Sequence, residues 1–244
     1  MTVQIVEIMG RATQGMTRPF ICRGDDGHIY FVKGRGGTRR GQICEWISGQ
    51  LAMRLGLPIA PFEIVEVSDT LLSIASDETR NELGEGAAFG SRKSTVVELS
   101  RSHIDHVPDY VQRDVLAFDW WIRNADRNLT KFGGNPNLFW DVEAQALVVI
   151  DHNQAFDPSF SPTQFLDFHV FSDQRHALFD DWVLRQEYNN RLAAAMADWS
   201  AICHTLPPAW WFIDPEETIA TEFDLNQVHS QLMQFQNESF WRQT

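Results

Sequence analysis

Four charged residues of this 244-residue chain have the types and the order that phosphoryl transfer requires. Lys33 ends an apolar stretch typical of a strand, and Glu45 stands early in the helix predicted next. Asp126 follows a long apolar helical pattern, and Asp151 comes directly after Leu147-Val148-Val149-Ile150. A lysine held by a glutamate can neutralise nucleotide phosphates, while aspartates can bind a hard cation or accept a proton from a hydroxyl.

Taken singly, three of these residues have an ordinary explanation as solvated groups or helix caps. Asp151 is harder to explain in that way, because it emerges at the end of a strand of four apolar residues. A buried carboxylate without a partner is costly, so such a position usually has a ligand or a partner. A functional role for Lys33, Glu45 and Asp126 is indicated by their order along the chain.

The elements that would position these residues change character along the sequence. Before residue 75 the apolar periodicity predicts strands at 3–8, 20–23, 28–33, 62–67 and 71–74, with a helix at 42–55. Beyond residue 94 it predicts helices at 110–123, 181–204 and 225–241, with short strands at 137–140 and 147–150.

We therefore expect an α+β protein with a two-lobed, protein-kinase-like fold. A strand-rich N-lobe would span residues 1–75, and a mainly helical C-lobe would span residues 95–244. Residues 76–94 are rich in Asp, Glu, Gly and Ser and show little periodicity, which predicts a loop or linker. That segment could gate a cleft, contact a substrate or simply connect the lobes.

Charge and composition limit the classes of partner that the protein is expected to bind. The net charge of −13 repels phosphate polyanions, so direct nucleic-acid and membrane binding are not expected. Three widely spaced cysteines and the absence of a basic-then-apolar N-terminal pattern favour a reduced, cytoplasmic setting. The densest cationic stretch contains Arg35, Arg39 and Arg40, and could be a local basic patch or a solvated turn.

Six segments resemble the HipA-like kinases, whose fold is akin to that of phosphatidylinositol 3-/4-kinases. They correspond, in chain order, to the loop over the nucleotide phosphates (13–20), the strand lysine (30–33), the helix glutamate (44–46), the catalytic loop (124–128), an Asn-Pro-Asn-Leu-Phe-Trp segment (135–140) and the metal-binding segment (149–156). The Asn-Pro-Asn segment is characteristic of the short subgroup that lacks an extra N-terminal domain.

The resemblance implies ATP and Mg²⁺ as cofactors and assigns a role to each matching residue. It places Gly15 and Thr17 in the nucleotide loop, and Lys33 on the ATP phosphates with Glu45 as its partner. Asp126 would be the catalytic base or the residue that orients the substrate. Asp151 would bind Mg²⁺, with Asn135 or Asn137 as the second protein ligand. Asp126 and Asn135 are nine residues apart where the family has five, so residues 131–134 read as an insertion and both asparagines stay candidates.

The leading prediction is an ATP- and Mg²⁺-dependent kinase that phosphorylates a Ser or Thr hydroxyl on a protein, in a regulatory or toxin-like role. By the same resemblance, Thr13 and Thr17 are hypothetical sites of self-phosphorylation. The alternatives are a nucleotide-binding pseudokinase or interaction module, and a kinase acting on a small-molecule or lipid acceptor. A metal hydrolase is disfavoured, because the histidines are scattered and form no His-Glu-x-x-His pair.

Overall fold

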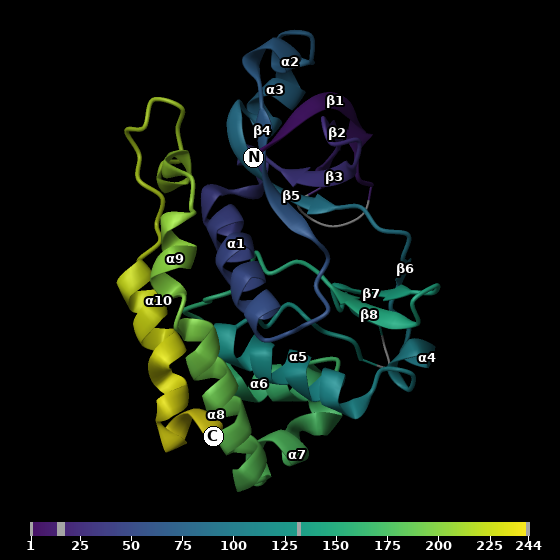
Figure 1. Ribbon diagram of the computed structural model, residues 1–244, viewed down its shortest axis with the longest axis vertical. Coiled ribbons are helices and arrows are strands. Elements are labelled where there is room, and N and C mark those ends of the chain that lie inside the picture. Colours follow the sequence, from purple (N-terminus) through teal and green to yellow (C-terminus); the bar gives the residue numbers. More distant parts are fainter. Residues whose placement is uncertain (1, 14–17, 131–132, 243–244) are drawn as a thin grey trace. The chain divides into compact units, whose positions relative to one another are not determined.

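The computed structural model of the chain describes residues 2–13, 18–130 and 133–242 (Figure 1). These residues form a mixed α+β protein, as the periodicity predicted. The chain divides into two compact units, and each is assembled from separate stretches of sequence. The first contains Met1–Trp46, Ala60–Ser94 and Thr205–Phe223, and the second contains Ile47–Ile59, Thr95–His204 and Asp224–Thr244.

Five strands of the first unit close into a barrel in the order β1-β2-β3-β5-β4 (Figure 1). Their bounds are β1 Val3–Arg11, β2 Phe20–Gly24, β3 Ile29–Lys33, β4 Phe62–Val67 and β5 Gly86–Arg92. Neighbouring strands pair antiparallel, except for β1 and β4, which pair parallel. Gly27 has φ 81° in the turn between β2 and β3, so the hairpin expected from the Asp-Gly pair is confirmed.

Alternate side chains of the strands fill the barrel. Phe20 and Cys22 of β2 and Tyr30 and Val32 of β3 are buried, in step with the two-residue period of a strand. Their core also includes Ile5, Val65, Val67, Leu72, Leu83 and Ala88. Lys33 is the last residue of β3. Because the inward face of this strand is packed, the backbone position of Lys33 is fixed.

One predicted strand of the first unit was wrong. Residues 71–74 lie mostly in helix α2 (Asp69–Ser73) rather than in a strand. The hydroxyl of Ser68 accepts a hydrogen bond from the Leu71 N–H and so caps the helix, and this local cap outweighs the apolar pattern.

The loop expected over residues 76–94 was also wrong. The segment contains helix α3 (Asp77–Leu83), capped by Ser76, followed by strand β5. Small residues hide β5 from a hydrophobic pattern, and the structure shows why they are needed. A Cβ atom added at Gly90 would lie 2.7 Å from Cγ1 of Val65, so only glycine fits there.

The second unit is built around helix α5 (Asp109–Ile122), whose last eight residues are all buried. Trp121 anchors this helix, because its indole N–H donates to the Leu232 carbonyl oxygen at 2.8 Å. The other elements are β6 Val97–Glu98, β7 Leu138–Asp141, β8 Ala146–Val149, α4 Arg101–Ile104, α6 Pro162–Phe168, α7 Arg175–Asp180, α8 Trp182–Met196, α9 Trp199–His204 and α10 Leu225–Leu232. The three strands pair in the order β6-β7-β8.

Two long helices predicted near the C-terminal end are interrupted. Residues 181–204 form α8 and α9, because the Ala197 N–H bonds to the Ala194 carbonyl in a tightened last turn. Residues 225–241 form α10 and then short 3₁₀ turns, which let the Trp241 indole donate to the Phe235 carbonyl. No helix in the described part of the chain is both long and apolar enough to cross a membrane.

Helix α1 (Arg39–Arg54) carries Glu45, and a 3₁₀ turn (Arg35–Gly37) separates it from β3. The turn begins at Gly34, which passes so close to α3 that an added Cβ would lie 2.2 Å from the Leu83 carbonyl oxygen. The path of the backbone from Lys33 into α1 therefore depends on a glycine at position 34.

We expect Gly34→Ala to destabilise the protein by about 1–3 kcal/mol, because backbone atoms of Leu83 cannot move aside cheaply. Gly36→Ala is the matched control, since its new Cβ would meet Glu82 at 3.4 Å, an ordinary contact. Urea unfolding of both variants measures the difference. Equal unfolding midpoints for the two variants would contradict the close approach.

Candidate functional site

The segment that carries Asp126 starts at a sharply defined helix end. Arg123 ends α5 in the left-handed conformation, with φ 52°. The next residue, Asn124, is 1% exposed. Its backbone N–H donates to the backbone carbonyl of Asp119 at 2.9 Å, and its side-chain Nδ2 donates to the carboxylate Oδ1 of Asp119 at 3.1 Å. The backbone carbonyl and the buried carboxylate of Asp119 therefore both hold the chain where it leaves α5.

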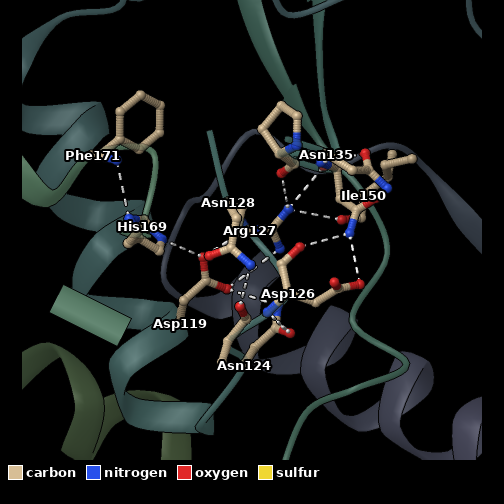
Figure 2. A network of polar contacts seen from close by, with 12 residues as sticks. Asp119, Asn124, Asp126, Arg127, Asn128, Asn135, Ile150, His169 and Phe171 are labelled. Carbon is tan, nitrogen blue, oxygen red and sulfur yellow. Dashed lines mark hydrogen bonds and ion pairs between the residues drawn. The ribbon is translucent and has the colours of Figure 1, made fainter. Parts of the chain in front are cut away.

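Arg127 and Asp119 form a fully buried ion pair (Figure 2). Nε of Arg127 donates to Oδ2 of Asp119 at 2.6 Å, and Nη2 donates to Oδ1 at 3.3 Å. Nη1 donates to the backbone carbonyls of Pro136, Asn137 and Ile150, at 3.3, 2.8 and 3.0 Å. One guanidinium thus joins helix α5, the Asn-Pro-Asn segment and the end of β8.

These bonds set the positions of the two aspartates predicted to do the chemistry. Asp126 precedes Arg127 and is exposed, while Asp151 follows Ile150 and is partly buried. Asp151 has φ 59°, a left-handed conformation that is uncommon outside glycine. The arginine holds the carbonyl before Asp151, and the Phe156 N–H bonds to the Ile122 carbonyl at 2.7 Å, so both ends of the turn are tied.

His169 completes the environment of the buried carboxylate. Its Nδ1 accepts a hydrogen bond from the Phe171 N–H at 3.1 Å, so its proton is on Nε2, which donates to Asp119 at 3.0 Å. Burial lowers the pKa of His169 below 6.5, which keeps it neutral at pH 7. Burial would raise the pKa of Asp119, but Arg127 and His169 outweigh it and lower this pKa to about 2.

Asn137 lies directly against Asp126. Its Nδ2 donates to the backbone carbonyl of Asp126 at 2.9 Å and to the carboxylate Oδ2 at 3.0 Å. Its Oδ1 accepts no hydrogen bond from any residue that the structure describes. Asn135 is exposed instead, and its side-chain oxygen accepts the Asn137 N–H at 3.3 Å. The two asparagines therefore have different environments, and only Asn137 touches Asp126.

The longer spacing between Asp126 and the asparagines has a local explanation. Thr130 and Gly133 exchange two backbone hydrogen bonds, each of 3.1 Å, so these two residues are held together. Gly134 then packs under Asn128, where an added Cβ would lie 2.3 Å from the carbonyl oxygen. The chain can thus return to Asp126 in spite of the four extra residues.

Lys33 and Glu45 pair in the first unit, as predicted. Nζ of Lys33 and Oε1 of Glu45 form an ion pair, with side chains that are 10% and 3% exposed. β3 positions the lysine and α1 positions the glutamate, which lies on the second turn of that helix. Each charge compensates the other in a setting where either alone would be costly to bury.

The remaining predicted residues have different outcomes. Gly15 and Thr17 lie outside the described residues. Among residues 2–13, 18–130 and 133–242, no three His, Cys, Asp or Glu side chains gather into a metal-binding cluster. Asp151 and Asn137 instead offer one carboxylate and one amide oxygen, hard donors of the type that suits Mg²⁺ carried by a nucleotide.

Sequence reasoning assigned no role to Asp119, Arg127 or His169. Asp119 did carry a signal, because it is an acidic residue inside an otherwise apolar helical stretch, next to Trp120 and Trp121. The pairing of Asp119 with Arg127 and His169 had no such signal, since the partners are eight and 50 residues away in sequence.

The chain matches a known protein family. The family model described as HipA-like kinase matches residues 5–244. A solved structure of the Helicobacter pylori proinflammatory kinase CtkA aligns over 99% of this chain and 98% of its own, at 11% identity and a TM-score of 0.45. Two structures of CtTel1 align over 97% of this chain and 12% of theirs, at 14% identity and a TM-score of 0.32. No curated protein matches the chain.

The low pKa of Asp119 predicts a specific acid sensitivity. A carboxylate whose pKa falls from 3.8 to about 2 on folding contributes about 2 kcal/mol, present above pH 4 and lost as the pH falls towards 2. We expect Arg127→Met to cost about 3–5 kcal/mol at pH 7, because it strands the buried charge of Asp119. Its stability should also fall less than that of the wild type between pH 4 and pH 3.

Urea unfolding at pH 7, 4 and 3 measures both effects. Asp77→Asn is the control, since its exposed pair with Arg80 should contribute less than about 1 kcal/mol. A wild-type stability that stays constant from pH 4 to pH 3, or an Arg127→Met variant as stable as Asp77→Asn, would contradict the assigned role of the pair.

Proposed function

Since the chain belongs to the HipA-like kinase family, we propose that it is an ATP- and Mg²⁺-dependent kinase that phosphorylates a Ser or Thr hydroxyl of a protein. A two-lobed, kinase-like arrangement is part of this proposal. The observation that carries it is the contact of Asn137 with Asp126. In protein kinases, an asparagine downstream of the catalytic aspartate serves as a metal ligand.

Asp126 is proposed as the residue that orients and deprotonates the acceptor hydroxyl. Its carboxylate is exposed, and Asn137 holds its Oδ2. As Asp126 accepts the proton, the hydroxyl oxygen forms a bond to the γ-phosphorus. The bond between that phosphorus and the β,γ-bridging oxygen then breaks, and ADP leaves with the bonding electron pair.

Asp151 and Asn137 are proposed as the residues that would hold Mg²⁺. When bound, the metal would offset the negative charge of the phosphates. The donor set fits a hard cation, because one residue supplies a carboxylate and the other an Oδ1 that no described residue uses. Asn135 fits less well, since its oxygen already accepts the Asn137 N–H.

Lys33 is proposed to contact the α- and β-phosphates, with Glu45 keeping its ammonium in place. Gly15 and Thr17 stay proposed members of the phosphate loop. Self-phosphorylation of Thr13 or Thr17 likewise stays a hypothesis, and peptide mass mapping after incubation with ATP tests it. An unmodified loop in an active enzyme would count against it.

We expect Asp126→Asn to lower phosphate transfer from labelled ATP by roughly 10²–10⁴-fold, because the proton acceptor is lost. MgATP should still stabilise this variant against heat, by about 2.7 kcal/mol at 100 times Kd. Asp151→Asn should lose both the transfer and the Mg²⁺-dependent part of the stabilisation. Transfer at the wild-type rate in both variants would sink the assignment.

The same measurements separate the alternatives. Stabilisation of the wild type by MgATP, with no transfer to any protein, would identify a pseudokinase. Transfer to phosphoinositides in liposomes would identify a lipid kinase, although the net charge of −13 opposes binding to anionic head groups. Transfer to a protein at Ser or Thr, located by peptide mass mapping, supports the leading proposal.

The two asparagines form a matched pair for a third test. We expect Asn137→Ala to weaken the apparent affinity for Mg²⁺ roughly 10- to 100-fold, measured by titrating the metal at saturating ATP. Asn135→Ala should change it less than threefold, because this side chain is exposed and only supports the turn. The opposite ranking would transfer the metal-binding role to Asn135.

A further inference from the structure

The burial of Arg39 distinguishes the two interpretations of the cationic stretch, which were a local basic patch and a solvated turn. It is the first residue of α1, yet it is only 7% exposed, so a solvated turn does not describe it. Arg35, in the 3₁₀ turn before α1, is partly buried as well. Long charged side chains are rarely buried unless they are paired, so these two arginines should have ion-pair or hydrogen-bond partners.

The hydrogen bonds of Arg39 are few and long. Its Nη1 donates to the Ala87 carbonyl at 3.4 Å and to Oε1 of Gln42 at 3.5 Å. The Ala87 carbonyl already accepts the Trp210 indole N–H at the shorter distance of 2.9 Å. Nε of Arg39 is buried and has no hydrogen-bond partner in the part of the chain that the structure describes. A guanidinium with five N–H donors is left poorly satisfied here.

Among the described residues, no carboxylate compensates the charge of Arg39. Within the described residues neither Arg39 nor Arg35 forms an ion pair with a carboxylate. Nε of Arg35 is likewise buried without a partner, and it packs over Gly84, where an added Cβ would lie 2.7 Å from it. Burial and the positive charge of Arg35 lower the pKa of Arg39 to about 10.

The helix adds to this positive field. α1 has 16 residues and no acidic residue in its first turn, so nothing there opposes the partial positive charge of its N-terminal end. Glu82 comes near Gly36, but it is ion-paired with Arg11. Two cations at the positive end of a helix are the reverse of the usual arrangement, and together they match an anion.

We propose that Arg39 and Arg35, at the N-terminal end of α1, bind a phosphate group, either inorganic phosphate or the phosphate monoester of a phosphorylated side chain. Guanidinium forks match the oxygens of a tetrahedral phosphate, which would satisfy donors that no described residue satisfies. The proposal stands apart from the kinase activity and needs no transfer reaction.

This site is distinct from the pair that would serve the nucleotide. Arg39 and Glu45 are six residues apart on α1, which turns their side chains about 120° apart around the helix axis. Glu45 faces Lys33, and that pair is internally compensated. Arg39 therefore lies on another face of α1 than Glu45, and with Arg35 from the preceding turn it forms a second positive site.

The first test compares thermal melting in chloride and in phosphate buffers of equal ionic strength. Phosphate also stabilises proteins generally by exclusion from their surface, so the comparison is made between variants. We expect phosphate to raise the melting temperature of the wild type more than that of Arg39→Met. Arg54→Gln, which removes a positive charge from the last turn of the same helix, should respond like the wild type.

In chloride, Arg39→Met should be as stable as the wild type or more stable, since it replaces an uncompensated buried charge with an apolar side chain. If that variant fails to fold, Arg35→Met takes its place. An equal response of all variants to phosphate would overturn the proposal, and so would a wild type that does not respond at all.

Titration calorimetry then identifies the source of the phosphate. Inorganic phosphate and O-phospho-L-threonine are titrated into the wild type and into Arg39→Met, with L-threonine as the blank. We expect the variant to bind the preferred ligand at least about tenfold more weakly, the loss that one charge-assisted hydrogen bond produces. Tighter binding of phosphothreonine favours a phosphorylated side chain, and tighter binding of phosphate favours the free anion. Binding of neither would contradict the site.

A last comparison separates this site from the nucleotide. Lys33→Met should lose stabilisation by MgATP and keep its response to inorganic phosphate. Arg39→Met should show the opposite pattern. If Arg39→Met instead loses both responses, the arginine belongs to the nucleotide site and the separate site is refuted. Failure of the kinase assay alone leaves the phosphate result standing, so the two proposals fail independently.

Discussion

The buried ion pair of Asp119 and Arg127 is the interaction on which the candidate site depends. Neither residue has a proposed role in the chemistry, yet the pair joins α5 to the two segments that carry the side chains proposed to bind the metal. Burying two charges is costly, and the cost is tolerated only when nearly every donor and acceptor is satisfied. Here Asn124, His169 and three backbone carbonyls complete the network, so the geometry around it has little freedom.

The network also explains how unusual backbone conformations persist in the second unit. Asn137 and Asp151 have φ 50° and 59°, conformations that cost non-glycine residues about 1–3 kcal/mol each. Arg127 donates to the carbonyl of Asn137 and to the carbonyl that precedes Asp151. Both of these residues have proposed roles on the metal, and the surrounding hydrogen bonds hold them in place before any ligand binds.

The first unit shows two ways of handling buried positive charge within one stretch of sequence. Lys33 is matched by Glu45, so that pair is complete without a ligand. Arg35 and Arg39 have no carboxylate partner among the described residues and stand where the helix dipole is also positive. The chain as a whole is acidic, with a net charge of −13. The local excess of positive charge therefore results from where these arginines lie in the fold and not from the composition of the chain.

The sequence by itself determined the mixed fold class, most strands and helices, the order of the charged residues and the family resemblance, which the match over residues 5–244 confirms. These follow from local periodicity and short motifs, which a single chain displays directly. The contact of Asn137 rather than Asn135 with Asp126, the burial of Arg127, the lack of a carboxylate partner for Arg39 among the described residues and the existence of β5 were decided by the tertiary structure alone. Each of these depends on partners distant in sequence, or on space that only the packed fold leaves, as at Gly90, and no local pattern encodes such a contact.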